Sequence, residues 1–291
     1  WRWLSDGYDV VQGRCVVRNG DASWVARMIA VEFEVIYGVS HPGRARLHGF
    51  GIFGGSNGYW RRDVLRQIRL QRSMLTEDID STMRSLRDGF KIVSDPGLIS
   101  TELAPTTMGA LWGQRMRWAQ GWTQNARRHL RPALTSDRLS GRQKLGAGFL
   151  LGWAQIIPWV SIQVIPILGF SAWRDDGLGH LDWLIPLFVL LSVFTVTVGG
   201  AQTVFAYMLG DIQVRRHRAW FVLYAIHSML WFGELKNVIA RVAQLKELTG
   251  DRVWRITPRN TPAPGAADDG SLDASYADSA GPSAYPSAWA E

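Results

Sequence analysis

The chain has 291 residues, a hydrophobic content of 47% and a formal net charge of +7. This length accommodates one globular domain and a further region. The single cysteine, Cys15, excludes an intrachain disulfide and a cysteine-based zinc site, and none of the six histidines has HExxH spacing.

The first part of the chain has the mixed composition of an α/β domain. Residues 8–18 predict a strand and 22–39 a helix, and residues 47–53 predict a second strand. This strand runs into a glycine-rich turn, GGSNG at 54–58, and a helix is expected to restart near Arg61. Alternating strands and helices indicate an α/β layer structure. Taken alone, the turn is a weak signal, because such loops often only supply positive φ angles.

A second helix is predicted to begin after Thr76, which suits the N-cap, and to stop at Gly89. Glu77 and Asp78 then lie in the first turn. These acids either complement the helix dipole or supply a general base, which must be ionised and within reach of the proton it removes. A metal site at Asp78 and Asp80 is a further interpretation, but polar residues rather than an apolar strand precede them.

The sequence QRMRWAQGW at 114–122 lies on a helix expected from about residue 107. Gln114 and Arg117 share its polar face, whereas Trp112 is expected on an apolar face toward the core. Trp118 lies at the edge of the polar face and is therefore predicted to be available to a ligand ring. Arginine matches phosphate oxygens in a fork geometry. The alternative is an ordinary helix at a membrane interface.

Three apolar stretches are candidate membrane spans: 145–170, 181–209 and 219–235. The third is marginal in length, and a buried or interfacial helix is its alternative. The positive-inside rule places 171–180 outside and 211–218 in the cytoplasm, because arginines cluster before the first span and after the second. A full crossing by the third stretch would place the basic residues after it outside, which conflicts with this orientation.

Composition divides the chain into three regions. Residues 1–144 are the α/β part, 145–257 the membrane region with two or three spans, and 258–291 a tail of Ala, Pro, Gly, Ser and Asp. The tail is predicted to be disordered, since it cannot bury enough apolar area to offset the entropy of ordering it.

Two motifs in order, TED at Thr76–Asp78 and QxxRW at Gln114–Trp118, followed by apolar spans, resemble the C-terminal half of a membrane-embedded glycosyltransferase of family 2. This group includes cellulose, hyaluronan, chitin and mannan synthases. FGGSNG resembles the family's acceptor-side loop, VVQGR its VQ strand, and the match extends over about residues 1–257, including VWRITPR. The resemblance implies an α/β fold, a partial GT-A (nucleotide-diphospho-sugar transferase) domain followed by transmembrane helices.

The resemblance also implies roles for individual residues. Asp78 would deprotonate the acceptor hydroxyl, with Glu77 as the second catalytic candidate. Gln114 and Arg117 would hold the donor diphosphate, and Trp118 would stack on the acceptor sugar. The remaining substrate-binding candidates are those of the acceptor-side loop: Gly55, Ser56 and Asn57.

The implied activity is inverting transfer from a nucleotide-sugar donor to a saccharide acceptor or growing polymer, with processive β-polysaccharide synthesis expected. A divalent metal, Mg or Mn, is expected in the full-length enzyme, with its DxD ligands outside this chain and no metal ligand assigned within it. The chain begins at Trp1 rather than Met, so we expect a fragment. By the resemblance it lacks the donor-binding half with its DxD motif, and it is therefore expected to be inactive alone.

The implied setting is an integral membrane protein whose catalytic part is cytoplasmic and whose partners include the lipid bilayer. The alternative is a non-catalytic membrane anchor or transport subunit with a basic cytoplasmic domain. The positive charge alone also suggests nucleic-acid binding, but no nucleic acid is expected, because the arginines cluster beside the spans and anionic lipid is the simpler partner.

Overall fold

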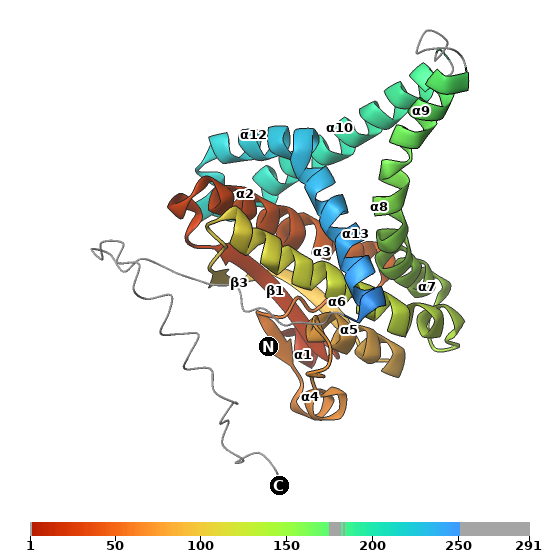
Figure 1. Ribbon diagram of the computed structural model, residues 1–291. Coiled ribbons are helices and arrows are strands. Elements are labelled where there is room, and N and C mark those ends of the chain that lie inside the picture. Colours follow the sequence, from red (N-terminus) through yellow and green to blue (C-terminus); the bar gives the residue numbers. More distant parts are fainter. Residues whose placement is uncertain (1, 175–181, 183, 251–291) are drawn as a thin grey trace, which may run out of the picture. The chain divides into compact units, whose positions relative to one another are not determined.

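Three strands form the sheet of the α/β part, in the order β2-β1-β3 (Figure 1). The computed structural model describes residues 2–174, 182 and 184–250, all within a compact unit that covers 1–257. The central strand β1, Val10–Val17, is buried along its whole length, which confirms the strand predicted at 8–18. It pairs antiparallel with β2, Gly58–Trp60, and parallel with β3, Ile92–Glu102.

The strand predicted at 47–53 is wrong. Its first residues end the helix α3, His41–His48, which stops at Gly49 with a φ of 77°. The following residues make isolated hydrogen bonds instead of a β-ladder: Gly51 N–H donates to Ile92 O at 2.8 Å and Phe53 N–H to Thr82 Oγ1 at 3.0 Å. The apolar residues of this stretch are thus buried against β3 and the helix that carries Thr82, and β3 itself was not predicted.

The helix predicted at 22–39 is confirmed. Ser23 caps α2, Trp24–Phe33, by accepting a hydrogen bond from Ala26 N–H at 3.1 Å. The helix continues with π-type bonding as η2, Glu34–Ser40, and α2 packs on β1. Three short elements complete this part: α1, Arg2–Ser5, η1, Gly20–Ala22, and α4, Arg62–Ile68.

Both motif-bearing helices begin where the sequence predicts. Helix α5, Glu77–Asp88, ends at Gly89 with a φ of 90°, and helix α6, Met108–Thr135, is capped by Thr107, whose side chain accepts from Ala110 N–H. The predicted apolar face of α6 is wrong, because Trp112 is 39% exposed. The buried face instead carries polar side chains, since each pairs with a partner on a neighbouring helix or loop, among them Arg115, Gln124, Asn125 and His129.

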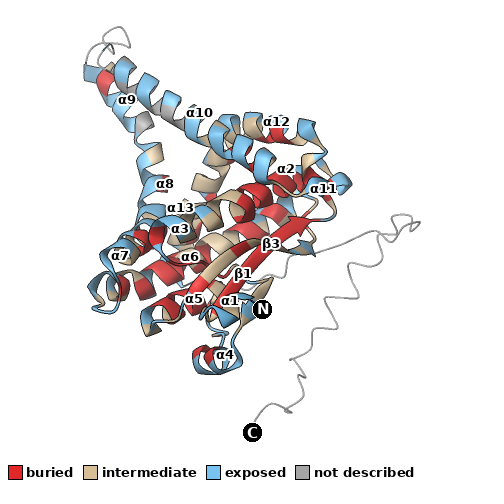
Figure 2. Cartoon of the chain, turned by 180° about the vertical axis from the view of Figure 1, so that it is seen from behind, coloured by how far each residue is buried: buried red, intermediate tan, exposed pale blue. Residues whose placement is uncertain are grey.

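The second half of the described chain is helical. Its elements are α7 (Gly141–Ala147), η3 (Gly148–Trp153), α8 (Ala154–Ile162), α9 (Val164–Arg174), α10 (Leu184–Leu209), α11 (Ile212–Arg215), α12 (Arg218–His227), η4 (Ser228–Phe232) and α13 (Gly233–Thr249). Helices α8, α9 and α10 project from the body, and most of their described residues are exposed (Figure 2).

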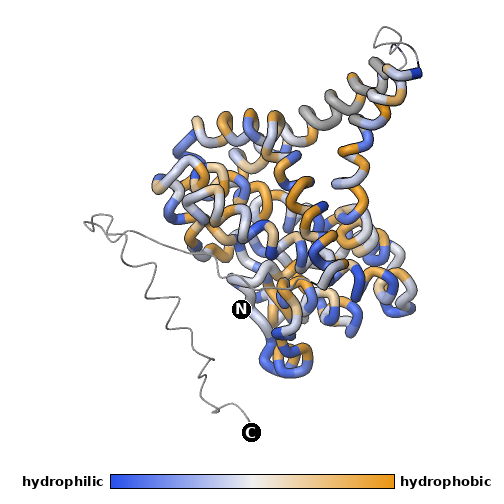
Figure 3. Tube along the Cα trace, in the orientation of Figure 1, coloured by the Kyte–Doolittle hydropathy of each residue, from blue (hydrophilic) through white to orange (hydrophobic). Residues whose placement is uncertain are grey.

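Hydrophobic residues predominate along α8 and α9 (Figure 3). Within the described residues, one helical stretch, Gly141–Arg174, is long and apolar enough to cross a membrane, and it contains the predicted span 145–170. The stretch 219–235 is divided between α12, which packs on α2, and the start of α13, which packs on α6. The predicted tail at 258–291 and the whole of VWRITPR lie outside the residues that the structure describes.

The C-terminal end of α10 is bonded to the α/β part. Arg14 of β1 donates from Nη2 to Leu209 O at 2.8 Å, and Asp211 N–H donates to Glu34 Oε2 at 3.0 Å. Arg14 and Glu34 are themselves buried and lie 3.7 Å apart as an ion pair. Buried polar contacts therefore connect the C-terminal end of α10 to the central strand β1.

Candidate active site

The TED motif places Asp78 in the first turn of α5, beside the glycine-rich turn. The Asp78 carboxylate accepts a hydrogen bond from Ile79 N–H at 2.8 Å. Gly55 has a φ of 85°, and a Cβ built on it would lie 3.0 Å from Asp78 Oδ2. A glycine is therefore needed at this position for two reasons: the left-handed backbone and the close approach of the carboxylate.

Gln12 of β1 fixes the position of the turn. Its side chain is fully buried; Oε1 accepts from Gly54 N–H at 2.7 Å, and Nε2 donates to Ser56 O at 3.0 Å. The sequence offered one signal here, the resemblance of VVQGR to the family's VQ strand, and it did not reveal that Gln12 holds the turn. Because a buried amide must satisfy its hydrogen bonds, Gln12 holds the turn in one conformation.

Asn57, a predicted substrate-binding residue, lies in the turn with a φ of 51°. Its amide donates to Arg14 O and to Leu98 O, both at 2.8 Å, so the side chain bridges β1 and the β3 region. Gly13 permits this, since a Cβ there would lie 2.7 Å from Asn57 Cγ. The structure thus places the Asn57 amide on the main chain beneath the turn.

Ser56, also predicted to bind substrate, directs its hydroxyl to the end of β3. The hydroxyl donates to the Glu102 carboxylate and lies 3.1 Å from Cys15 Sγ. Burial, with the Glu102 charge, raises the pKa of the Cys15 thiol to about 11. Cys15 is therefore a protonated core residue at neutral pH, with no thiolate available for chemistry.

The Asp78 carboxyl has a raised pKa. Burial, assisted by the nearby negative charge of Glu77, raises its pKa from 3.8 to about 6, although the Ile79 amide and the Arg117 charge act in the opposite direction. Arg117 is thus near enough to act on Asp78. A carboxylate with this pKa is ionised at neutral pH and is a better proton acceptor than an exposed aspartate.

The TED and QxxRW motifs are in direct contact. Asn125 Nδ2 donates to Thr76 Oγ1 at 2.9 Å and to Thr76 O at 3.2 Å. A Cβ on Gly121 would lie 2.5 Å from Thr76 Cγ2, so the glycine of QRMRWAQGW lets α6 approach the start of α5. Gln124 adds a third bond, accepting from Leu75 N–H at 3.0 Å.

Asp80 fastens the same two helices one turn later. It is fully buried, and its carboxylate lies 2.7 Å from Arg84 Nε and 2.8 Å from His129 Nε2 of α6. Burial by itself raises the pKa of Asp80, but the bonds from His129 and Arg84 outweigh it and lower the pKa below its ordinary value. Asp80 is therefore committed to side-chain partners and does not face a shared site with Asp78.

The residues of QxxRW occupy different environments. Gln114 is 6% exposed, and its Oε1 has no hydrogen-bond partner within the described part of the chain. Arg117 is half-buried, and Trp118 packs, partly buried, against the core cluster of β1 and α2. The indole of Trp118 is therefore fixed on one side, as expected of a platform rather than a mobile surface ring.

Arg115, within the same motif, supports the Trp118 ring. Its guanidinium carbon lies 4.3 Å from the ring centroid, and the guanidinium is paired with the buried Glu32 carboxylate of α2. Lys236 of α13 lies 3.3 Å from the other oxygen of Glu32. Burial raises the pKa of Glu32, but the charges of Arg115 and Lys236 outweigh it, so the pKa is lowered. No local sequence pattern indicates this pairing of Glu32 with Arg115, because the two residues are 83 positions apart.

The expected divalent metal finds no ligand set among these residues. No group of three or more His, Cys, Asp or Glu side chains with metal-binding geometry occurs in the described residues. Asp80, which the sequence offered as a partner for Asp78, is bonded to Arg84 and His129.

A profile of a glycosyltransferase family matches most of the chain, and this match gives the class of protein: a glycosyltransferase. The chain belongs to the family described as "Glycosyl transferase family group 2", whose profile matches residues 1–233.

Similar proteins are polysaccharide synthases by name. The chain is 27% identical over 192 residues to poly-beta-1,6-N-acetyl-D-glucosamine synthase of Staphylococcus epidermidis, covering 64% of this chain and 44% of that protein. It is 22% identical over 256 residues to probable glucomannan 4-beta-mannosyltransferase 7 of Oryza sativa subsp. japonica, covering 86% of this chain and 40% of that protein. The chain thus spans less than half the length of these relatives.

A solved structure is also similar, the mannosyltransferase PcManGT from Pyrobaculum calidifontis in complex with GDP-Man and Mn2+. The similarity covers 84% of this chain and 56% of that chain, with a TM-score of 0.45 and 18% sequence identity.

Proposed function

We propose that this chain forms the acceptor-side part of a membrane-bound, inverting glycosyltransferase with a partial GT-A fold, which transfers a sugar from a nucleotide-sugar to a saccharide and builds a β-linked polymer processively. The observation that carries the proposal is Asp78, whose pKa is raised to about 6 and which lies against Gly55 under the influence of Arg117. Transfer of a sugar from a nucleoside diphosphate to a hydroxyl group requires a base for the hydroxyl proton and a cation for the departing diphosphate. Asp78 and Arg117 are the candidates for these two roles, and the turn at Gly55 lies close to the base.

In the proposed reaction Asp78 accepts the proton of the acceptor hydroxyl. The hydroxyl oxygen forms a bond to the anomeric carbon, and the bond from that carbon to the nucleoside diphosphate breaks, with its electron pair leaving on the diphosphate. Attack on the face opposite the leaving group inverts the anomeric centre. Glu77, the neighbouring carboxylate, contributes by holding the pKa of Asp78 up.

Gln114 and Arg117 are proposed to contact the diphosphate. The partnerless Gln114 Oε1 supports a polar ligand on this part of α6, because buried amide groups are seldom left without a hydrogen bond. A divalent cation, when bound, would neutralise the departing diphosphate, but its ligands are not among the described residues and no step here depends on it.

Trp118 is proposed to stack on the acceptor sugar. The ring is held from one side by the core and from another by Arg115, at 4.3 Å, so it offers a fixed apolar surface. Of the turn, Gly55 and the backbone of Ser56 and Asn57 are proposed to face the acceptor, because the two side chains are bonded to Glu102 and to the main chain.

We also propose that the enzyme is integral to the membrane, with the α/β part in the cytoplasm. Helices α8, α9 and α10 support this, being apolar and largely exposed where the structure describes them (Figures 2 and 3). The division of 219–235 between α12 and α13 favours an interfacial placement of that stretch, which removes the conflict in orientation. Cysteine labelling in sealed vesicles tests this: 171–180 should react from outside and 211–218 from the cytoplasmic side.

The activity is tested with the full-length enzyme and a panel of nucleotide-sugars, comparing Asp78→Asn with Glu77→Gln. Asp78→Asn should abolish transfer while donor binding stays within a few-fold, since the base acts only on the acceptor proton. Glu77→Gln should retain transfer, with its pH profile moved to lower pH because a negative charge beside Asp78 is removed. Normal turnover by Asp78→Asn would end the base role, and absence of donor binding by the unaltered protein would end the proposal.

A further inference from the structure

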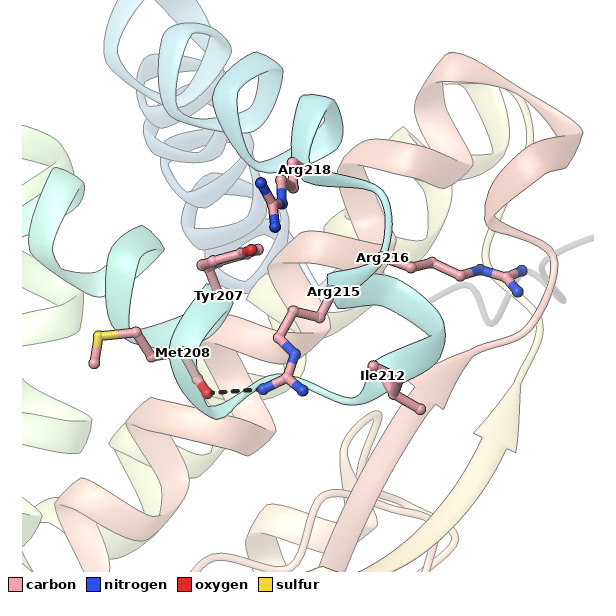
Figure 4. A pocket seen from close by; sticks show the side chains of 6 residues that line it. All are labelled: Tyr207, Met208, Ile212, Arg215, Arg216 and Arg218. Carbon is pink, nitrogen blue, oxygen red and sulfur yellow. Dashed lines mark hydrogen bonds between the residues drawn. The ribbon is translucent and has the colours of Figure 1, made fainter.

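A pocket of about 420 Å³ lies where the apolar helix α10 ends, away from Asp78 and its neighbours. It is enclosed by the last turn of α10, by α11 and by the start of α12 (Figure 4). Its lining residues are Tyr207, Met208, Ile212, Arg215, Arg216 and Arg218. Half of this lining is therefore arginine, although the pocket adjoins the most apolar helix of the chain.

The three arginines lack acidic partners. No carboxylate lies within 4 Å of any of them among the residues that the structure describes. Arg215 donates only to Met208 O, at 3.4 Å, and Arg216 Nε lies 3.0 Å from His217 Nε2. The nearest acid in sequence, Asp211, is occupied: it caps α11 by accepting from Gln213 N–H at 2.9 Å. Within the described residues, the positive charge of this pocket therefore has no acid paired with it.

The directions of the side chains differ. Figure 4 shows the guanidinium groups of Arg215 and Arg218 on the side of the loop from which Tyr207 projects, whereas Arg216 extends away from them. Two guanidinium forks on either side of one tyrosine suit the oxygens of a phosphate, which arginine binds in pairs of hydrogen bonds.

Apolar groups are exposed around the same charges. Met208 is 60% and Ile212 is 62% exposed, and the outer face of the neighbouring α12 carries exposed Val222, Leu223 and Ile226. A soluble phosphate or a nucleic acid would leave these side chains in water. A phospholipid matches both the arginines and the exposed apolar side chains, because its phosphate is attached to acyl chains that cover apolar surface.

We propose that this pocket binds the phosphate of an anionic phospholipid through Arg215 and Arg218, with Met208 and Ile212 against the start of its acyl chains. The proposal rests on the membrane placement proposed above and assigns a lipid to a site separate from the sugar-transfer site. An anionic rather than a zwitterionic headgroup is expected, because the pocket offers cations and no carboxylate to pair with a headgroup amine.

The experiment is native mass spectrometry of the full-length protein in detergent with equal amounts of phosphatidylglycerol and phosphatidylcholine of the same chain length. The unaltered protein should retain the anionic lipid preferentially. Arg215→Gln with Arg218→Gln should lower that preference about 30-fold, at about 1 kcal/mol for each arginine near the headgroup. Arg138→Gln is the matched control: it removes the same kind of charge from an exposed position outside the pocket and should change the preference less than about twofold.

Three outcomes would overturn the proposal: an equal loss in Arg138→Gln and the double variant, no preference in the unaltered protein, or release of the lipid by inorganic phosphate alone. The first would mean diffuse charge, and the last a site for a free anion. Should the double variant fail to elute as a folded species, Arg218→Gln alone should still lower the preference about fivefold. Flotation with phosphatidylcholine vesicles, which needs no anionic site, tests the membrane placement separately.

Discussion

Replacing Asp78 by asparagine should stabilise the folded protein while it abolishes transfer. Burial raises the pKa of Asp78 from 3.8 to about 6, so the folded state holds the proton more tightly than the unfolded chain does. A raised pKa in an acid favours folding below pH 3.8, and this contribution is lost as the pH rises through 6. At pH 7 and above the protein therefore carries a buried charge that asparagine lacks.

The magnitude follows from that difference in pKa. At 1.36 kcal/mol for each pH unit, the ionised Asp78 costs about 3 kcal/mol of stability at pH 8. Asp78 is partly exposed, so about 3 kcal/mol is an upper bound. Asparagine keeps an oxygen that can accept the Ile79 N–H bond, found at 2.8 Å. For a domain of this size the gain corresponds to a rise in the unfolding midpoint of roughly 5 to 10 °C.

The assay is thermal unfolding of the detergent-solubilised protein at pH 5 and at pH 8. Asp78→Asn should be more stable than the unaltered protein at pH 8, and the difference should shrink at pH 5. Asp80→Asn is an internal control of opposite sign: its pKa is lowered by His129 and Arg84, so its contribution is present above the unfolded pKa and the variant should be less stable at pH 8. Equal or lower stability of Asp78→Asn at pH 8 would refute the reasoning.

Three further predictions concern α6. Gly121→Ala should destabilise the protein by about 1 to 3 kcal/mol in denaturant unfolding, because its Cβ would overlap Thr76; unchanged stability would contradict the contact. Glu32→Gln should lower the free energy of unfolding by about 3 to 5 kcal/mol, because it leaves the buried Arg115 without its carboxylate partner. Since Arg115 lies over the Trp118 ring, the near-ultraviolet circular dichroism should also change; an unchanged spectrum would count against this contact. Arg117→Lys should raise the KM for the donor more than it changes acceptor use, since lysine has no fork; equal effects would reject donor contact.

Local signals predicted the local features well. The starts of α5 and α6 were found because Thr76 and Thr107 precede apolar periodicity, and the end of α5 because Gly89 takes a left-handed conformation. The strand β1 was found from its apolar run. These features depend on residues a few positions apart, which a sequence displays directly.

Features that depend on distant partners were not predicted. The inward polar face of α6 is explained by partners on other elements, among them Thr76, Asp80 and Glu32. The stretch 47–53 reads like a strand, but its neighbours offer isolated hydrogen bonds rather than a ladder. Hydrophobic periodicity indicates which residues are buried, but it does not indicate which residues they contact.

The approach of Gly121 to Thr76 has a mechanical consequence. The start of α5 and the middle of α6 are joined by that contact, by the bonds of Asn125 and by the Asp80–His129 pair. Under the proposed roles, the proton acceptor and the aromatic platform are then parts of one rigid piece and keep a fixed separation through each cycle. Release of a finished linkage must therefore come from displacement of the sugar chain along that piece, and not from opening of the protein between its two working groups.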